Sequence, residues 1–412
     1  MKKHPTPVAP AGDNIELRTS IGGWVLMVLI CALNLNGADI KRVDEDIAKG
    51  RAGAVVVSGA TLAHTAQLLP MDLQGKVLHV GDPYKQTEAV FDLLDKVLAA
   101  AQSKRESVVK LNVYVADDEV SGEVRTEVRR RFGKNLPAVS YVRGQLLKDG
   151  ALLSLDAVVV SLKNVGKVES VQLTDVHAVP GGSHVTFMPA GSKAYVSGMA
   201  GKGTMTTATD ETMKQLWGVL DFLKAQPAQV VQIKAFLNPM TDQGVVMEEM
   251  RKRYPQGQMP VVSLVEWTST LPVEIEMIVA LPKAESQLPV VEYLTPPEVK
   301  ASPVYSRIAR VNGGKDVYIS GLYGEVATTG DAQLKAVFGE LRRLSESAGS
   351  DLRHLVKATY YVASDDTNRR LNEVRPDYYD PARPPAASKA AVRGAGMSGR
   401  TVTLDMLAVT KE

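Results

Sequence analysis

Three acidic residues lie inside otherwise apolar, strand-like segments of the sequence. They are Asp156 in residues 153–158, Glu276 in 273–278 and Asp405 in 402–407. Burying a carboxylate without a partner is costly, so these residues either have a hydrogen-bonded structural role or take part in chemistry, for example by orienting a water molecule. A strand-like segment with a serine precedes each of them, at residues 137–140, 260–263 and 385–388.

A second recurring feature is a Ser-Gly pair that ends a short run of β-branched or aromatic residues. The three serines are Ser58, Ser197 and Ser320, in segments 54–59, 194–198 and 317–321. Glycine lacks a Cβ and suits a turn, so the pair is a common turn requirement. The serine hydroxyls are also candidates for contacts with a ligand.

The same order of elements recurs three times along the chain. After each Ser-Gly pair, apolar residues at helical spacing predict an amphipathic helix, and residues 108–115, 230–237 and 355–362 alternate as a strand does. A second helix then ends near Phe132, Tyr254 and Tyr379, and the serine and carboxylate strands follow. This self-similarity predicts three tandem copies of one unit.

Each copy is predicted to be an α+β unit, a mixed sheet with two helices on one face. We assign an N-terminal lead to residues 1–46 and the units to residues 47–165, 176–283 and 300–412. The segment before the third unit holds several prolines and is typical of a stiff linker. Because helices cover only one face of each sheet, we expect a neighbouring copy to bury the other face.

Composition argues against several classes of function. Lys and Arg number 48 against 46 Asp and Glu, a formal net charge of +2 with both signs scattered, so we expect no nucleic acid partner. The single cysteine, Cys31, excludes an intrachain disulfide and a multi-cysteine zinc site. The six histidines show no metal-ligand spacing, so we expect no metal and no cofactor.

An apolar run at residues 21–33 is shorter than the roughly 20 residues that a transmembrane helix needs. Lys2, Lys3 and Arg18 precede it, and Gly37 and Ala38 follow, a pattern that fits an export signal. We therefore expect an exported protein, periplasmic or extracellular. The alternatives are an uncleaved anchor or interfacial segment, or a buried strand of the first unit in a cytoplasmic protein.

An ordered series of short motifs runs along the third copy: SPVYS at 302–306, VYISG at 317–321, DAQ at 331–333, AGSD at 348–351, LVK at 355–357, LNEV at 371–374, RP at 383–384 and LDMLA at 404–408. In this series the third copy resembles the Rid family, the YjgF-like reactive intermediate deaminases that are also labelled L-PSP endoribonucleases. The resemblance covers nearly all of residues 300–412, most of 47–162 and, more loosely, 180–282.

This resemblance implies a chorismate-mutase-like fold for each unit. Known Rid proteins are homotrimers with ligand clefts between subunits, so three copies on one chain imply an intramolecular pseudo-trimer with clefts between copies. Rid deaminases hydrolyse enamine or imine products, and they hold the substrate carboxylate with an arginine whose planar fork suits that group. The matching positions here are Val139, Val262 and Ala387, so the fork is missing from all three copies.

Other cleft positions of the family are retained. In the third copy the resemblance implies catalytic roles for Asp405, Ser320, Tyr305 and Asn372. In the first two copies Ser58, Asp156, Ser197 and Glu276 correspond as ligand-binding candidates, while Arg125 and Met247 stand at the asparagine position. Strand periodicity places Lys389 on the face of Ala387 and Arg143 on the face of Val139, where each cation is a candidate to bind substrate in place of the fork.

The leading hypothesis is a divergent Rid-like protein that binds a small molecule, or assembles, through clefts between its own units. Deamination requires the C=N bond to be held against a water molecule in near-attack geometry, and the missing fork argues against it. The alternative is an enamine or imine deaminase that works in a cleft lined by the third copy, with Lys389 replacing the fork and Asp405 steering water. An endoribonuclease is disfavoured, because no basic stripe with aromatic residues is present.

Overall fold

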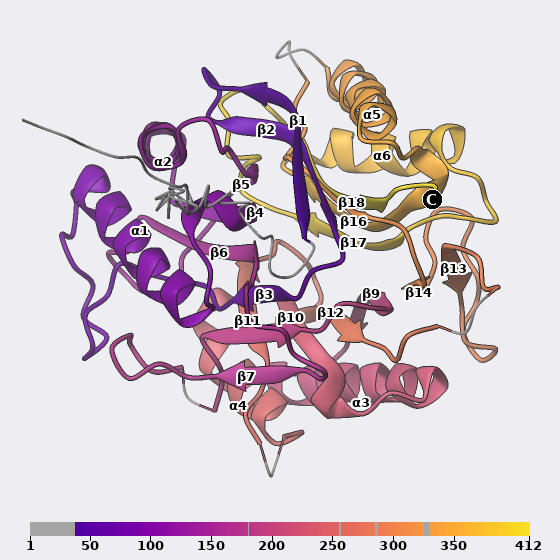
Figure 1. Ribbon diagram of the computed structural model, residues 1–412, viewed down its shortest axis with the longest axis horizontal. Coiled ribbons are helices and arrows are strands. Elements are labelled where there is room, and N and C mark those ends of the chain that lie inside the picture. The colour runs from indigo at the N-terminus through magenta and orange to yellow at the C-terminus, as the bar shows by residue number, and fades with distance from the viewer. Residues whose placement is uncertain (1–37, 180, 255–256, 285–286, 325–328) are drawn as a thin grey trace, which may run out of the picture. The chain divides into compact units, whose positions relative to one another are not determined.

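Three mixed sheets of six strands organise the protein, in a computed structural model that describes residues 38–412 except 180, 255–256, 285–286 and 325–328 (Figure 1). The described residues belong to one compact unit. Two long helices accompany each sheet: α1 Pro83–Ala100 and α2 Asp118–Phe132, α3 Met205–Leu223 and α4 Gln243–Arg251, and α5 Gly330–Ser347 and α6 Asp365–Tyr378. The prediction of three tandem α+β units is confirmed.

The three sheets share one strand order. The first is β5 Ala138–Arg143, β4 Val108–Val115, β6 Leu153–Val160, β3 Leu62–Thr65, β8 Val185–Met188, β7 Glu169–Val171. The second is β11 Val261–Glu266, β10 Val230–Leu237, β12 Val273–Ala280, β9 Lys193–Gly201, β14 Ile308–Val311, β13 Val291–Leu294. The third is β17 Ala386–Ala391, β16 Leu355–Val362, β18 Val402–Val409, β15 Asp316–Ile319, β2 Arg51–Ser58, β1 Asp39–Asp46.

A two-stranded hairpin that lies outside the four-stranded core completes each sheet. The hairpin β7–β8 follows the four-stranded core of the first sheet and pairs with β3, and β13–β14 follows the core of the second and pairs with β9. The hairpin β1–β2 begins the described chain, yet it pairs with β15 of the third sheet. Figure 1 shows this indigo hairpin against the orange and yellow strands. The start and the end of the described chain are therefore joined in one sheet.

We name the units by their cores: unit one holds β3 to β6, unit two β9 to β12, and unit three β15 to β18. Strand pairing fixes which residues are equivalent. Tyr318 lies opposite Leu407, Tyr195 opposite Ile278 and His64 opposite Val158, so these three residues occupy one place in the three sheets.

This register corrects the sequence alignment in unit one. The place of Ser197 and Ser320 is taken there by Ala66, two residues beyond His64. Ser58 instead ends β2 and lies opposite Asp39 in the hairpin. The sequence pattern groups Ser58 with Ser197 and Ser320 because all three precede a glycine. A Ser-Gly pair does not specify which sheet edge its strand joins.

The helices begin where the sequence offers caps. Asp82 accepts a hydrogen bond from the Lys85 amide at the start of α1, with Pro83 next in the chain, and Thr329 does the same for Ala332 at α5. The apolar face of α1 then buries Val90 and Leu94 against its sheet.

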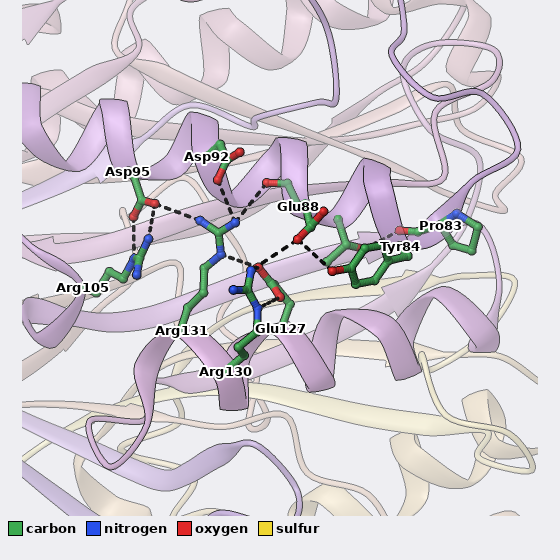
Figure 2. A network of polar contacts seen from close by, with 10 residues as sticks. Pro83, Tyr84, Glu88, Asp92, Asp95, Arg105, Glu127, Arg130 and Arg131 are labelled. Carbon is green, nitrogen blue, oxygen red and sulfur yellow. Dashed lines mark hydrogen bonds and ion pairs between the residues drawn. The ribbon is translucent and has the colours of Figure 1, made fainter.

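An ion-pair network fixes α1 to α2 (Figure 2). Arg131 of α2 lies 2.7 Å from Asp92 and 2.9 Å from Asp95 of α1, and it also contacts Glu127. Arg105 adds a two-point contact to Asp95. The side chain of Arg131 is 7% exposed, so these pairs are less screened than surface pairs, and they hold α1 in a fixed position.

The helix-free faces of the three sheets meet in the interior. Tyr114, Phe236 and Tyr361 occupy equivalent places on β4, β10 and β16 and share one buried cluster, with the Phe236 and Tyr361 rings 6.3 Å apart. The sequence predicted that a neighbouring copy would bury each of these faces, and such contacts form the pseudo-trimer.

The expected export segment lies outside the described residues. Within the described ranges, no helix combines the length and the apolar character that crossing a bilayer requires.

Candidate functional site

The three strand carboxylates lie at the three junctions between units. Each accepts a hydrogen bond from the serine of the next unit: Asp156 from Ser263 at 2.8 Å, Glu276 from Ser388 at 2.5 Å, and Asp405 from Ser140 at 3.3 Å. The carboxylate and serine strands of the sequence are thus brought together in pairs, but always across a junction and never within one copy.

Two buried lysines form ion pairs with two of these three carboxylates. Lys110 Nζ lies 2.7 Å from Asp405 Oδ1, and Lys357 Nζ lies 2.7 Å from Glu276 Oε1. Gln232 has the equivalent place in unit two, opposite Ile278. At the junction between units one and two, Asp156 accepts hydrogen bonds from neutral donors instead of a lysine: Asn112 at 2.7 Å and Tyr114 at 2.9 Å. Burial alone would raise the pKa of Asp405, but the ammonium groups of Lys110, Lys234 and Lys357 hold it well below its usual range.

A third lysine, Lys234, is 5% exposed and lines a cavity of about 30 Å³ between the three sheets. His64 Nε2 and Asn112 Oδ1 belong to residues lining the same cavity and are buried without a hydrogen-bond partner among the described residues. The carboxylates therefore belong to an internal polar network, which is mainly structural, rather than to an open cleft.

The clefts lie further out, where the edge strand and second helix of one unit meet the preceding unit. The cleft between units one and two is open and contains a cavity of about 480 Å³. Residues from three regions line it: Ala66–Leu69 and Leu93 of unit one, residues 176–179 of the β7–β8 connection, and the α4 face with Met247. Val262, which the sequence resemblance matches to the family's arginine, forms part of the wall.

Three polar side chains on the inner wall of this cavity are already hydrogen-bonded to the protein. Gln67 donates to Ser154 at 2.8 Å and accepts from the Leu264 amide at 2.9 Å. His184 uses both ring nitrogens, one toward the Leu173 amide and one toward the His177 carbonyl. Gln243 donates to the Leu147 carbonyl. The inner wall therefore presents mainly apolar surface to a bound molecule.

The cleft between units three and one is filled by the protein itself. Ser320 accepts a hydrogen bond from the Val139 amide at 2.8 Å and donates to the Ala52 carbonyl at 2.6 Å. Tyr323 hydroxyl bonds the backbone of Tyr141, and Arg51 lies over the Tyr323 ring and contacts the Gly321 carbonyl. Ser320 is thus committed to backbone contacts.

The cleft between units two and three is polar. Arg307 donates to Ser197 at 3.3 Å and to the Gly198 carbonyl at 3.1 Å, while its Nε is buried without a partner. The Gly198 amide in turn donates to Ser388 at 3.1 Å.

Two further groups border the same cleft. Lys389 donates to Asn372 of α6 at 3.1 Å, and Tyr305 lies beneath the guanidinium of Arg307. These contacts place one arginine, one lysine and several hydroxyl groups within a single junction.

Glu274 also belongs to this polar cleft. A Cβ on Gly198 would lie 2.0 Å from its Oε1, so the carboxyl group packs directly on that glycine. Burial, with the nearby charge of Glu276 second, raises the pKa of Glu274 to about 7, against the opposing effects of Ser388, Arg307 and Lys389. Such a group can exchange a proton near neutral pH.

Two segments of the chain, residues 48–161 and 296–410, match the family model described as Endoribonuclease L-PSP. The chain belongs to this family. This match confirms the family that the sequence predicted.

One similar structure is a Rid family protein from Yersinia pestis, with 20% identity, a TM-score of 0.28, and coverage of 30% of this chain and 98% of that chain. A YjgF family member from Neisseria meningitidis has 24% identity and a TM-score of 0.23, covering 30% of this chain and 96% of that one. A YjgF family member from Streptococcus pyogenes has 18% identity and a TM-score of 0.22, covering 30% and 96% respectively.

The residues that the Rid resemblance singled out are therefore divided among the junctions of this L-PSP family protein. Ser320 and Asp405 lie between units three and one; Tyr305, Asn372, Lys389, Ser197 and Glu276 lie between units two and three; Asp156 lies between units one and two. Asp405 and Lys389 do not share a cleft, so the predicted pairing of these two residues does not form.

The guanidinium group of Arg143 is not free to bind a ligand beside Val139, because the protein itself supplies its partners. It lies 3.5 Å from Asp118 and donates to the Arg393 carbonyl at 2.9 Å. The sequence interpretation missed Lys110 and Lys357, although both occupy the same place on their strands and that recurrence was a readable signal. It also missed Glu274 on β12, and Arg307, which reaches unit two because β14 pairs with β9.

Proposed function

We propose that this L-PSP family protein binds a small, largely apolar molecule in the cavity between units one and two, and that it does not deaminate there. The observation that carries the proposal is the cavity of about 480 Å³, a size typical of ligand pockets. Val262 and Met247 occupy the two wall positions where the Rid resemblance implies an arginine and an asparagine.

The chemistry of the wall supports binding rather than hydrolysis. A carboxylate substrate needs a charge-assisted partner, and the inner polar groups of this cavity are used by the protein itself. An apolar molecule instead gains about 25 cal/mol for each Å² of apolar surface that it buries. Binding without turnover is the outcome that this balance favours.

The test is titration of the purified protein with the neutral fluorescent probe N-phenyl-1-naphthylamine. We expect saturable binding that Met247→Trp weakens at least tenfold, because the indole would occupy the cavity. Val245→Trp is the matched control, since Val245 is exposed on the same helix and does not line the cavity. No saturable binding, or equal binding by both variants, would contradict the proposal.

A second candidate function, an enamine or imine deaminase, is supported by the cleft between units two and three. Arg307 and Lys389 supply two cations there, although the family's arginine position holds Ala387. In that reaction water adds across the C=N bond of a 2-imino acid, and ammonia leaves to give the 2-oxo acid. Glu274, with a pKa raised to about 7 by burial, is the group in this cleft suited to move the proton.

Ammonia release from freshly generated 2-aminoacrylate measures this candidate directly. Arg307→Met should abolish any hydrolysis above the uncatalysed rate, whereas Arg310→Met should not. Arg310 is the matched control because it lies on β14, three residues beyond Arg307, and pairs with Glu292 at 3.7 Å. A wild-type rate equal to the uncatalysed rate would rule out the deaminase candidate and leave ligand binding as the proposed function.

A further inference from the structure

One wall of the cavity between units one and two is a face of α4. Gln243, Met247 and Arg251 line it at intervals of one helical turn, so it follows one face of the whole helix. At 1.5 Å rise per residue this face spans about 12 Å. The opposite wall is the apolar segment of unit one at residues 66–69 with Leu93. A linear molecule that lies along this face of α4 would contact all of its turns.

The ionisable groups on the cavity wall are not balanced. Glu248 is the one described carboxylate among the lining residues, and it receives two hydrogen bonds from Arg251, at 3.0 and 2.7 Å. That pair lies at the C-terminal end of α4 and is neutral as a whole.

Lys148 lies toward the other end of the cavity. It follows Leu147, whose carbonyl accepts the hydrogen bond from Gln243 at the start of α4. Lys148 is exposed, and none of the residues that the structure describes pairs with its ammonium group. An exposed ammonium group that pairs with none of the described residues therefore lies at the edge of an apolar cavity.

We infer that the ligand is a linear amphiphile with one carboxylate, bound with its aliphatic chain along α4 and its acid group at Lys148. The inference rests on the proposed function, because it assigns a chemical class to the molecule in the same cavity. The apolar wall accepts the chain, and Lys148 offers the charged partner that the inner wall lacks. A cationic head group would meet Lys148 with the wrong sign, and a neutral one would gain nothing from it.

The experiment is displacement of N-phenyl-1-naphthylamine from the purified protein by octanoate, 1-octanol and octylamine at low ionic strength. We expect octanoate to bind about fivefold more tightly than octanol, since an exposed ion pair contributes up to about 1 kcal/mol. Octylamine should bind most weakly. The preference for octanoate over octanol should decrease at high salt.

Lys148→Glu should reverse the order of octanoate and octylamine without changing the affinity for octanol. Lys134→Glu is the matched control, because Lys134 is an exposed lysine of the same unit that does not line the cavity. Equal binding of octanoate and octanol to the wild type would overturn the inference while leaving the proposed function intact. A preference lost in Arg251→Met but kept in Lys148→Glu would overturn the placement of the acid group. Failure of the probe itself to bind would refute the proposed function.

Discussion

Lys110 of unit one and Asp405 of unit three form an ion pair of 2.7 Å that closes the ring of units, with side chains 2% and 4% exposed. Lys110 also donates to Ser140 at 2.8 Å and to the Ile319 carbonyl at 2.7 Å, so all three protons of its ammonium group have a partner. The residue that the family resemblance assigned to water activation is thus a structural anchor between the first and last units.

Asp405→Asn should destabilise the protein by about 3–5 kcal/mol, because it leaves the Lys110 charge buried and unpaired. Urea denaturation at neutral pH measures the change. Replacing both partners, as Lys110→Met with Asp405→Leu, should recover much of the loss, since a buried ion pair can often be exchanged for apolar residues.

Arg369→Ala provides the control for that comparison. Its pair with Glu373 lies on the surface of α6, with side chains 62% and 44% exposed, and should contribute at most about 1 kcal/mol. A similar loss of stability in Asp405→Asn and Arg369→Ala would show that the buried Lys110–Asp405 pair contributes no more to stability than a surface pair.

His64 should make the protein sensitive to mild acid. Burial lowers its pKa to about 4, against about 6.5 in the unfolded chain. The stabilisation from neutral His64 is complete above pH 6.5 and is lost as the pH falls toward 4, by about 3 kcal/mol in total. His64→Tyr copies the residue at the equivalent place, Tyr195 or Tyr318, and removes this titration.

The measurement is the urea midpoint at pH 7 and at pH 5 for both proteins. The wild type should lose more stability between these values than His64→Tyr, whatever the absolute effect of the larger ring. Burial also lowers the pKa of His184, so the variant should retain a smaller acid dependence. Equal losses would show that the buried imidazole does not contribute.

The repeat and the fold class could be predicted from the sequence, because period-two strands and amphipathic helices are local patterns. The serine and carboxylate strands were also identified, and their residues do meet, as Ser388 and Glu276 do at 2.5 Å. What the sequence cannot specify is which of three similar sheet edges a hairpin joins. The sequence pattern of the hairpin β1–β2 would be the same beside β3, β9 or β15, the first core strands of the three units. In the structure the hairpin pairs with β15.

That uncertainty explains the errors at the candidate site. Ser58 was aligned with Ser320 by its Ser-Gly motif, whereas the register places Ala66 there. The contribution of Arg307 to the polar cleft follows from the pairing of β14 with β9 of unit two, which no local pattern reveals.

Removing the hairpin β1–β2 should open the ring of units. Without residues 39–58, β15 loses the partner of Val317 and Tyr318, and their backbone groups become a free edge. We expect a lower melting temperature and faster hydrogen exchange in β15 and β18 than in the strands of the second sheet. A synthetic peptide of residues 38–60 added in excess should restore protection. Unchanged exchange in β15 would contradict the closing role of the hairpin.

Glu274 should oppose stability as the pH rises. Its folded pKa of about 7 lies above the usual carboxyl value of about 4.3, so the protonated form favours the folded state, and this contribution is lost as the pH rises from about 4.3 through 7. Glu274→Gln keeps the shape but cannot ionise. Relative to the wild type, it should therefore be more favourable at pH 8 than at pH 5, measured by thermal melting. Glu346→Gln, at an exposed position of α5, is the control and should give a curve parallel to the wild type. Parallel curves for Glu274→Gln as well would mean that this carboxyl group does not hold a proton in the cleft, and would remove the proton carrier from the deaminase candidate.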